Sequence, residues 1–305
     1  MIKACFSEKY FAPTPTASMR KLPPVAKAAE RAGYVKLVDP GNIDVEKLRR
    51  LHAPEYVEAF LTGQGKLASA QGWPWTERIR DGVMAMNAGQ LVAARNALQH
   101  GIAANIAQGF HHARYPAGGG YCTFNGLALV AQEFPELKVC VLDCDEHGGN
   151  GTENFTQRLP NLLNFTINGS SFGCSTSERS ICLNLRAVTD CFEVYLAALQ
   201  SAFAQVSRWQ PDLIIYQAGA DPHVDDPLGS LGMTTEQLLL RDQEVFRYCR
   251  GTRCPTFFVL AGGYQEPIEE NLVPLHLNTF KAAYETYFGT GFNSSITCPA
   301  DLPEE

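Results

Sequence analysis

The sequence predicts a single α/β domain in which a mostly parallel sheet is connected by crossover helices. A chain of 305 residues, 45% of them hydrophobic, is long enough to bury a full core. Short runs rich in β-branched and aromatic residues alternate with longer segments of helical period, which is typical of parallel sheets. The sequence contains neither an internal repeat nor a linker rich in Gly, Pro or Ser. We therefore expect one domain at residues 1–292, followed by a loosely held surface tail at 293–305.

Four short runs are predicted to be buried parallel strands. They are too short and too rich in β-branched or aromatic residues for helices, and polar or Gly-containing loops follow each of them. These runs are 138–142, 162–167, 212–216 and 256–260. Other segments carry apolar residues at helical spacing, and we expect helices at 86–100, 124–134, 192–209 and 234–250. Thr234, followed by Glu236 and Gln237, is typical of a capped helix start.

Composition narrows the class of protein. The net charge of -7 and the absence of a Lys/Arg cluster argue against direct nucleic-acid binding, which depends on clustered basic residues. Ten cysteines are scattered along the chain, several of them inside apolar runs, and are expected to be reduced and mostly buried. No apolar run approaches the ~18 residues of a membrane span, and the first residues do not resemble a signal peptide. We expect a cytoplasmic protein without a membrane partner.

Polar residues follow three of the predicted strands at the point where each strand ends. Asp143, Asp145 and His147 follow the first strand, Asp221 follows the third, and the segment 262–264 follows the fourth. In open α/β sheets, ligands bind outside the carboxyl ends of the strands. These clusters, far apart in the sequence, are therefore expected to meet at one edge of the sheet.

The first two clusters predict a metal site. Alternation at the end of a strand places Asp143, Asp145 and His147 on one side, where carboxylate and imidazole groups can reach a common ion. Asp221, after the small residues 218–220, would complete an Asp, His, Asp set. Three protein ligands leave zinc an open position for water and substrate, as hydrolysis requires.

Simpler explanations exist for parts of these segments. The first could be a polar loop that caps a helix, and Asp221 could merely form a turn. For Asp225 and Asp226, which lie around two prolines, the turn explanation is at least as good as a functional one.

A histidine pair and a tyrosine complete the set of candidate catalytic residues. His111 and His112 can serve as general base and general acid if a partner holds the far nitrogen of each ring. The glycines at 118–120 would let the backbone approach a substrate, and the Tyr121 ring could form a wall. Tyr264 follows two glycines, a flexible hinge from which its hydroxyl could donate to an oxyanion. An ordinary core or surface tyrosine fits this last motif equally well.

Taken in this order, the paired histidines, the D-x-D-x-H and A-G-x-D segments and the G-G-Y segment resemble the histone deacetylase superfamily. The resemblance covers most of the chain and is closest to the class IV branch and its bacterial homologues. Further support comes from segments at 19–21, 52–57, 73–75, 125–131 and 264–265. The implied fold is the arginase/deacetylase type, an open, mostly parallel sheet of ~8 strands with helices on both faces.

The resemblance implies a role for each motif residue. One zinc ion per chain would be bound by Asp145, His147 and Asp221, and Tyr264 would stabilise the oxyanion. Asp143 would hold His111, and Asn150 would hold His112. The residues expected to line the substrate site are Gly120, Tyr121, Leu228 and Gly263. The family's structural potassium ion would use backbone carbonyls near Asp143, Asp145 and His147. The implied substrate is an acylated lysine in a protein, or else an acylated polyamine or small amine.

A neutral amide partner has a consequence for protonation. Asn150 can orient His112 but cannot stabilise its protonated form as a carboxylate would, so we expect His112 to be neutral.

The sequence also departs from the family pattern. Gly148 stands where relatives usually carry His or Gln, and Tyr121 replaces the usual Phe and adds a hydroxyl that needs a partner. Ala261 precedes the Gly-Gly pair where Gly or Ser is common, and no equivalent of the family's N-terminal His is found near Pro15. These changes affect the shape of the pocket more than the metal site.

Two competing interpretations remain. An arginase-like hydrolase would need a second metal ion and a further aspartate, which would fall on Gly149, so the sequence favours one ion. A catalytically inactive scaffold that binds acylated lysine would not need the complete set of ligands and acid-base groups found here.

Overall fold

A computed structural model describes residues 1–186 and 192–289, and its centre is one eight-stranded sheet in which every pairing is parallel. The strand order is β2-β1-β3-β8-β7-β4-β5-β6. The strands are β1 Ile2–Cys5, β2 Val35–Val38, β3 Ile102–Asn105, β4 Val139–Asp143, β5 Leu162–Asn168, β6 Ser180–Asn184, β7 Leu213–Ala218 and β8 Thr256–Leu260. The predicted tail at 293–305 lies outside the described residues, and the domain boundary stays a prediction.

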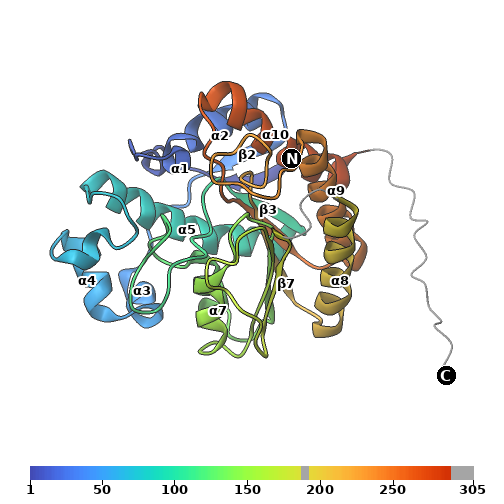
Figure 1. Ribbon diagram of the computed structural model, residues 1–305. Coiled ribbons are helices and arrows are strands. Elements are labelled where there is room, and N and C mark those ends of the chain that lie inside the picture. The colour runs from blue at the N-terminus through green and yellow to red at the C-terminus, as the bar shows by residue number, and fades with distance from the viewer. Residues whose placement is uncertain (187–191, 290–305) are drawn as a thin grey trace.

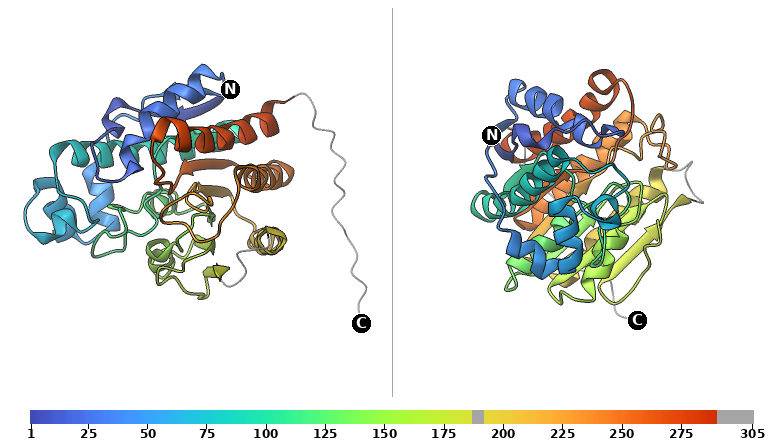
Figure 2. Two further views of the ribbon diagram at one scale, coloured as in Figure 1. Left: turned by 45° about the horizontal axis from the view of Figure 1, so that its top comes forward. Right: turned by 90° about the vertical axis from the view of Figure 1, so that its left-hand side faces the viewer.

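Helices cover both faces of the sheet (Figure 1 and Figure 2). Successive strand residues point to opposite faces, so Val139 and Val141 pack into one apolar cluster, and Cys140 and Leu142 into the other. The helices that pack mainly on the first face are α3 Val45–Leu51, α4 Pro54–Thr62, α5 Glu77–His100, α6 Gly126–Glu133 and α7 Asn150–Thr156. Those that pack mainly on the second are α2 Leu22–Arg31, α8 Phe192–Trp209, α9 Thr235–Thr252 and α10 Val273–Phe288.

Short elements complete the chain. They are α1 Ala17–Arg20, the 3-10 helices at Glu8–Tyr10 and Lys66–Ser69, and a π-helical turn at Ile268–Leu272.

The four predicted strands are confirmed, each end lying within two residues of the prediction. Four strands were not predicted, and β3 shows why: two of its four residues are alanines, which carry no strand preference. The predicted helix at 86–100 begins earlier, at Glu77, because the Thr76 side chain accepts a hydrogen bond from the Ile79 N–H at 3.1 Å and caps it. The predicted capped start at Thr234 is confirmed, with both hydrogen bonds of a capping box present.

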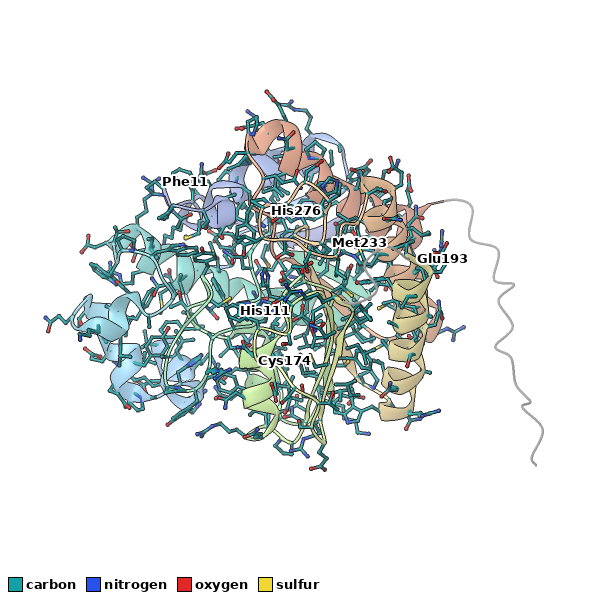
Figure 3. All side chains as sticks on the ribbon, viewed as in Figure 1. Phe11, His111, Cys174, Glu193, Met233 and His276 are labelled. Carbon is teal, nitrogen blue, oxygen red and sulfur yellow. The ribbon has the colours of Figure 1, made fainter. Side chains whose placement is uncertain are left out.

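The strand order positions the functional residues. β3, β8, β7 and β4 are consecutive in the sheet. Because all four run in the same direction, their carboxyl ends are neighbours, and the loops that follow them meet above one stretch of the sheet. Figure 3 labels His111, from the loop after β3, near the centre of the molecule. The predicted convergence of distant motifs is therefore confirmed.

Candidate active site

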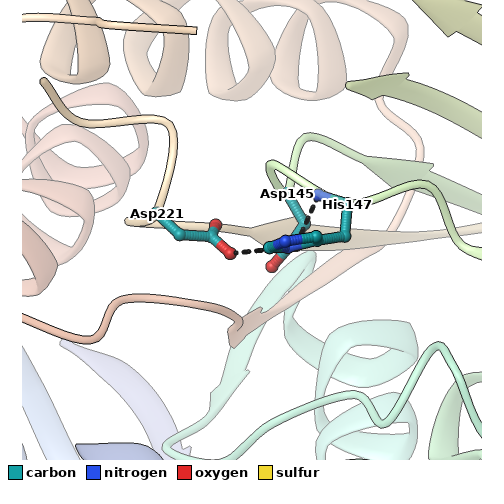
Figure 4. Close-up of side chains that lie close together, drawn as sticks. All are labelled: Asp145, His147 and Asp221. Carbon is teal, nitrogen blue, oxygen red and sulfur yellow. Dashed lines mark hydrogen bonds and ion pairs between the residues drawn. The ribbon is translucent and has the colours of Figure 1, made fainter. Parts of the chain in front are cut away.

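Asp145, His147 and Asp221 form a compact cluster where β4 and β7 end (Figure 4). One ligand atom from each lies within 4.8 Å of the other two. His147 Nδ1 is 3.4 Å from an Asp145 oxygen and 3.2 Å from an Asp221 oxygen. Since β4 pairs directly with β7, Asp145 and Asp221 reach the same point although they lie far apart in the chain.

The charges in this cluster favour a bound cation. Burial, reinforced by the charge of Asp145, raises the pKa of Asp221 to about 7. Burial lowers the pKa of His147, but hydrogen bonds and attraction from both carboxylates raise it to about 11 overall. Two buried carboxylates this close need a positive charge beside them. An imidazole nitrogen and two carboxylate oxygens are a donor set typical of catalytic zinc, so the residues fit the ion that the sequence predicts.

Backbone groups fix the two aspartate side chains. The N–H of Glu146 donates to Asp221 at 3.1 Å, and the N–H of Gly262 donates to Asp145 at 2.8 Å. A Cβ atom at Gly262 would lie 2.0 Å from the Asp221 carboxylate. Only glycine therefore lets the loop after β8 close over the cluster.

His111 and His112 each have the partner that the family resemblance implies. His111 Nδ1 lies 2.7 Å from Asp143 Oδ2, and His112 Nδ1 lies 2.9 Å from Asn150 Oδ1. Their ring centroids are 3.9 Å apart, and the two rings are tilted by 40° to each other. Since an amide oxygen only accepts, His112 donates from Nδ1 and keeps the lone pair of its Nε2.

The two histidines differ in protonation. Burial lowers the pKa of His111, but the charges of Asp143 and Asp145 outweigh this effect and raise it. Burial, followed by repulsion from His111, lowers the pKa of His112 well below its ordinary value. His112 is therefore neutral, as expected from the sequence, but the physical reason is different. The hydrogen bond to Asn150 raises the pKa of His112, so burial produces the neutral form.

Side chains from elsewhere in the fold make hydrogen bonds to the loop that carries Tyr264. This loop is therefore fixed in place, and the interpretation of its two glycines as a flexible hinge is corrected. Lys21 Nζ donates to the carbonyls of Ala261 at 2.6 Å and Gly262 at 2.5 Å. The Tyr264 N–H donates to Asp226 Oδ2 at 2.8 Å. Asp226 is buried, and its hydrogen bond positions the Tyr264 backbone. The Asp225 side chain, by contrast, is 77% exposed.

Two buried charged residues that the sequence did not point to, Arg241 and Glu146, make hydrogen bonds that connect the loops around the site. Arg241 Nη1 donates to the carbonyls of Cys144 at 3.0 Å and Gly219 at 2.8 Å, and so joins the loops after β4 and β7. The Glu146 carboxylate accepts hydrogen bonds from Ser230 Oγ and from the Leu231 N–H. A charged residue among leucines in a helix, as at position 241, is the signal that could have revealed this role.

A small cavity joins the catalytic candidates. This cavity of about 10 Å³ is lined by His111, Asp145 and Tyr264 together with Gln108, Gly109, Phe110, Gly120, Cys122, Gln217, Ala261 and Gly262. The space therefore suits one water molecule or a group of similar size.

Of the four predicted substrate residues, Gly120 lines this cavity. At Gly120 a Cβ atom would lie 2.5 Å from the His112 ring. Tyr121 stacks on Trp73, and its ring centroid is 5.9 Å from that of Tyr264.

Leu228 is 43% exposed, and its N–H donates to Asp226. Gly263 has a φ of 110°, a conformation that glycine adopts readily. One wall residue was not predicted: Phe172 is 47% exposed, and its ring centroid lies 4.3 Å from that of His112.

Comparison with known proteins identifies this arrangement. The family model described as histone deacetylase domain matches residues 16–280, which include every residue of the cluster, the histidine pair and Tyr264. The chain belongs to the histone deacetylase family. It is therefore a hydrolase that acts on amide bonds, and the predicted membership of the histone deacetylase superfamily is confirmed.

Individual relatives agree with the family match. An uncharacterized protein of Picosynechococcus sp. is 32% identical to this deacetylase-family chain over 248 residues, which cover 79% of this chain and 82% of that protein. Histone deacetylase 2 of Arabidopsis thaliana is 32% identical over 193 residues, 58% of this chain and 48% of that protein. The crystal structure of acetylpolyamine aminohydrolase from Burkholderia pseudomallei matches with a TM-score of 0.78 at 18% identity, covering 93% of this chain and 99% of that one. The last comparison confirms the predicted fold.

Within the described ranges 1–186 and 192–289, no helix is both long and apolar enough to cross a membrane.

Proposed function

We propose that this histone deacetylase family member is a zinc-dependent deacylase that hydrolyses the amide of an acylated lysine in protein. The observation that carries the proposal is that Asp145 of the metal set, His111 of the histidine pair and Tyr264 line one cavity. The Asp145, His147 and Asp221 set suits a zinc ion, the neutral His112 can accept a proton, and Tyr264 can donate a hydrogen bond.

The roles of the side chains follow from where charge develops. A zinc ion held by Asp145, His147 and Asp221 would polarise the substrate carbonyl and lower the pKa of a water molecule towards ~7. His112, neutral and with a free lone pair, takes the proton of the attacking water. Tyr264 donates its hydroxyl hydrogen to the oxyanion as the carbonyl becomes tetrahedral. His111, whose pKa is raised by Asp143, then supplies a proton to the leaving nitrogen.

The space around the site supports a short acyl group. The narrow cavity at His111 and Tyr264 has room for a group about the size of a water molecule beside the reacting carbonyl. An acetyl group has a single methyl there, and longer chains would need the surrounding side chains to move.

The rim supports a cationic partner. A wider opening of about 480 Å³ beside Tyr264 is lined by Asp225, Pro227, Gln265, Glu266 and Asn271. Glu266 forms an ion pair with Arg20, so the exposed Asp225 carboxylate would attract the neighbouring positive charges of a basic protein segment.

An acetylated polyamine is a second candidate substrate. The structural relative from Burkholderia pseudomallei is named as an acetylpolyamine aminohydrolase, and the same acidic rim would attract a free polyamine amine.

Finer predictions accompany this proposal. We place the chain nearest the class IV branch and expect it in the cytoplasm. We also expect one deacetylase domain at 1–292 and a structural potassium ion bound by backbone carbonyls near Asp143, Asp145 and His147. The class IV and potassium predictions rest on the family resemblance, and the other two rest on the composition of the sequence.

A substrate panel tests the proposal. Zinc-loaded protein is assayed with peptides that carry acetyl through long-chain acyl groups on lysine, and with acetylated polyamines. We expect the highest kcat/KM on an acetyl-lysine peptide. Preference for the polyamine would support the second candidate. Binding of acylated peptides without hydrolysis of any member would contradict the proposal and favour an inactive scaffold.

A further inference from the structure

Two cysteines that play no part in the proposed reaction lie together beside the active site. Cys174 and Cys182 flank a turn that is closed by an antiparallel bridge between Ser177 and Ser180. The Thr176 hydroxyl accepts a hydrogen bond from the N–H of Cys182 at 3.1 Å, which draws the two arms of the turn together. Figure 3 labels Cys174 in the region below His111.

The two thiols point toward each other. Cys182 lies on β6 between Ile181 and Leu183, which pack against the apolar cluster on the opposite face of the sheet. Cys182 therefore faces the side that carries α7 and the loop after β4. There its thiol makes a hydrogen bond with that of Cys174 and accepts another from Asn168 Nδ2 at 3.3 Å.

These hydrogen bonds make Cys182 chemically distinct. They lower the pKa of its thiol to about 7, the bond from Cys174 contributing most. In the other cysteines of the described part of the chain the pKa is raised, chiefly by burial in most of them. Cys182 is half-buried, at the edge of the sheet, so small molecules can reach it. A thiolate that is accessible and hydrogen-bonded to a second thiol is the usual arrangement for disulfide formation.

Cys174 is connected to the catalytic groups through Phe172. The Cys174 N–H donates to the Ser171 carbonyl at 2.7 Å, forming the turn that carries the Phe172 ring against His112. The Phe172 carbonyl accepts a hydrogen bond at 2.7 Å from Asn150, the partner of His112. Phe172 has a φ of 48°, an unfavourable conformation for a residue other than glycine, so its position depends on these neighbours.

The absence of a side chain at Gly148 leaves room for the turn that carries Cys174. A Cβ atom at position 148 would lie 2.8 Å from the Cβ of Cys174 and 2.5 Å from the carbonyl oxygen of Ser171. A larger residue there would push the turn away from the site. The departure from the family pattern at position 148 therefore has a structural counterpart in the turn that contains Cys174.

We propose that Cys174 and Cys182 form a dithiol modification site, which peroxides oxidise to a disulfide and which lowers the hydrolase activity when oxidised. The effect on activity rests on the proposed function, whereas formation of the disulfide does not. Joining the two sulfur atoms brings them to about 2 Å, so Cys174 moves towards β6. That movement pulls on the turn at Ser171 and Phe172 and disturbs the contacts of Phe172 with His112 and Asn150.

The reaction is balanced with hydrogen peroxide as the oxidant. The Cys182 thiolate attacks one peroxide oxygen, the O–O bond breaks, and hydroxide leaves, which gives a sulfenic acid at Cys182. The Cys174 thiol loses its proton and attacks the Cys182 sulfur, and a second hydroxide is expelled. With the two thiol protons, the hydroxides become two water molecules, and the sulfurs have lost two electrons to the peroxide.

Peptide mapping of the oxidised, full-length, zinc-loaded protein tests the modification itself. The protein is treated with increasing hydrogen peroxide, its free thiols are alkylated, and its peptides are analysed by mass spectrometry. We expect a Cys174–Cys182 disulfide to form before any other cysteine reacts, and dithiothreitol to reverse it. First oxidation at another cysteine, or a disulfide that includes Cys191 or Cys298, would overturn the proposal.

Activity measurements test the consequence. We expect acetyl-lysine hydrolysis to fall at least about fivefold on oxidation and to recover with dithiothreitol. The variant Cys182→Ser should retain its activity in peroxide, whereas Cys254→Ser, a matched change at a half-buried cysteine elsewhere, should respond like the unaltered protein. Cys174→Ala provides a second protected variant, and thermal melting verifies that each protein is folded.

The outcomes separate the two proposals. A mapped disulfide that leaves activity unchanged would overturn the coupling to the active site. Protein that hydrolyses no substrate in the panel would contradict the proposed function, and the peptide map would still decide whether the dithiol is oxidised.

Discussion

The carboxylate of Asp226 accepts a hydrogen bond from the backbone N–H of Tyr264 at 2.8 Å. The other oxygen of this carboxylate accepts from the N–H of Leu228 at 3.0 Å. One buried side chain thus connects the rim of the site to the loop that carries the proposed oxyanion donor. This pairing joins the loops after β7 and β8, and it leads directly to the first prediction.

Asp226→Asn should lower kcat about tenfold without releasing the metal. An amide offers one accepting oxygen where the carboxylate offers two, so one of the two N–H groups loses its partner, at a cost of ~1–3 kcal/mol. Asp225→Asn is the matched control, because that side chain is largely exposed. Removing its charge from the rim should raise the KM for a basic peptide, whereas kcat should stay within about twofold of the unaltered protein. Steady-state kinetics and metal analysis measure both effects; equal kcat values for the two variants would contradict the role of Asp226.

Tyr264→Phe should keep its zinc and lose ~10²–10³ in kcat, because a single oxyanion donor contributes about that much. The ring is retained, so its contact with Tyr121 is expected to persist. Tyr121→Phe, which also removes one hydroxyl from the same wall, is the control and should change kcat far less. Normal turnover of the Tyr264 variant would refute the assignment.

Metal removal should abolish hydrolysis, and one equivalent of zinc per chain should restore it. Because the ion would bind only the folded chain, zinc at about a thousand times its Kd would raise the melting temperature by roughly 6 °C. Asp221→Asn should weaken metal binding strongly. Elemental analysis that finds two manganese ions per chain in the active protein would instead support an arginase-like site.

Acidification should destabilise the fold through His52. Its Nδ1 donates to the Arg114 carbonyl at 2.9 Å, and its Nε2 accepts from the Asn125 N–H at 3.0 Å, so the neutral ring satisfies both neighbours. Burial lowers its pKa from 6.5 to about 4. The unfolded chain therefore binds a proton between these values while the folded chain does not. Stability is fully present above pH 6.5 and falls as the pH decreases towards 4, by up to about 3 kcal/mol.

Urea unfolding at several pH values checks this expectation. The difference in stability between the unaltered protein and His52→Gln should shrink as the pH falls from 7 to 4. His100→Gln, at the exposed end of α5, is the control. A constant difference between the unaltered protein and the His52 variant would show that His52 does not contribute to the pH dependence.

Gln108 should limit the length of the acyl group. It lines the narrow cavity with Gln217, and within the described part of the chain neither the Gln108 Nε2 nor the Gln217 Oε1 has a hydrogen-bond partner. Gln108→Ala should raise the ratio of kcat/KM for propanoyl-lysine over acetyl-lysine about tenfold, since one added methylene gains roughly 1–3 kcal/mol in a space that accepts it. Gln108→Leu keeps the volume and should leave the ratio near its original value. If both variants prefer acetyl as the unaltered protein does, Gln108 does not limit the chain length.

The sequence by itself determined the fold class and the main catalytic candidates. Hydrophobic runs of strand length predict parallel strands, and parallel strands place the residues that follow them at one edge. This is why Asp145, His147 and Asp221 could be grouped before any coordinates, and why the partners of His111 and His112 could be assigned by resemblance.

Only the tertiary structure decided which buried charges support that site. Lys21 reaches the carbonyl of Ala261 across 240 residues of sequence, and no local pattern encodes a contact of that kind. The same holds for Asp226, which the sequence could not distinguish from an ordinary turn residue beside proline. It also holds for the contact between Cys174 and Cys182. A sequence pattern records which face of an element is apolar. The partner of a polar side chain depends on how distant loops pack, and that is fixed only when the sheet and its helices assemble.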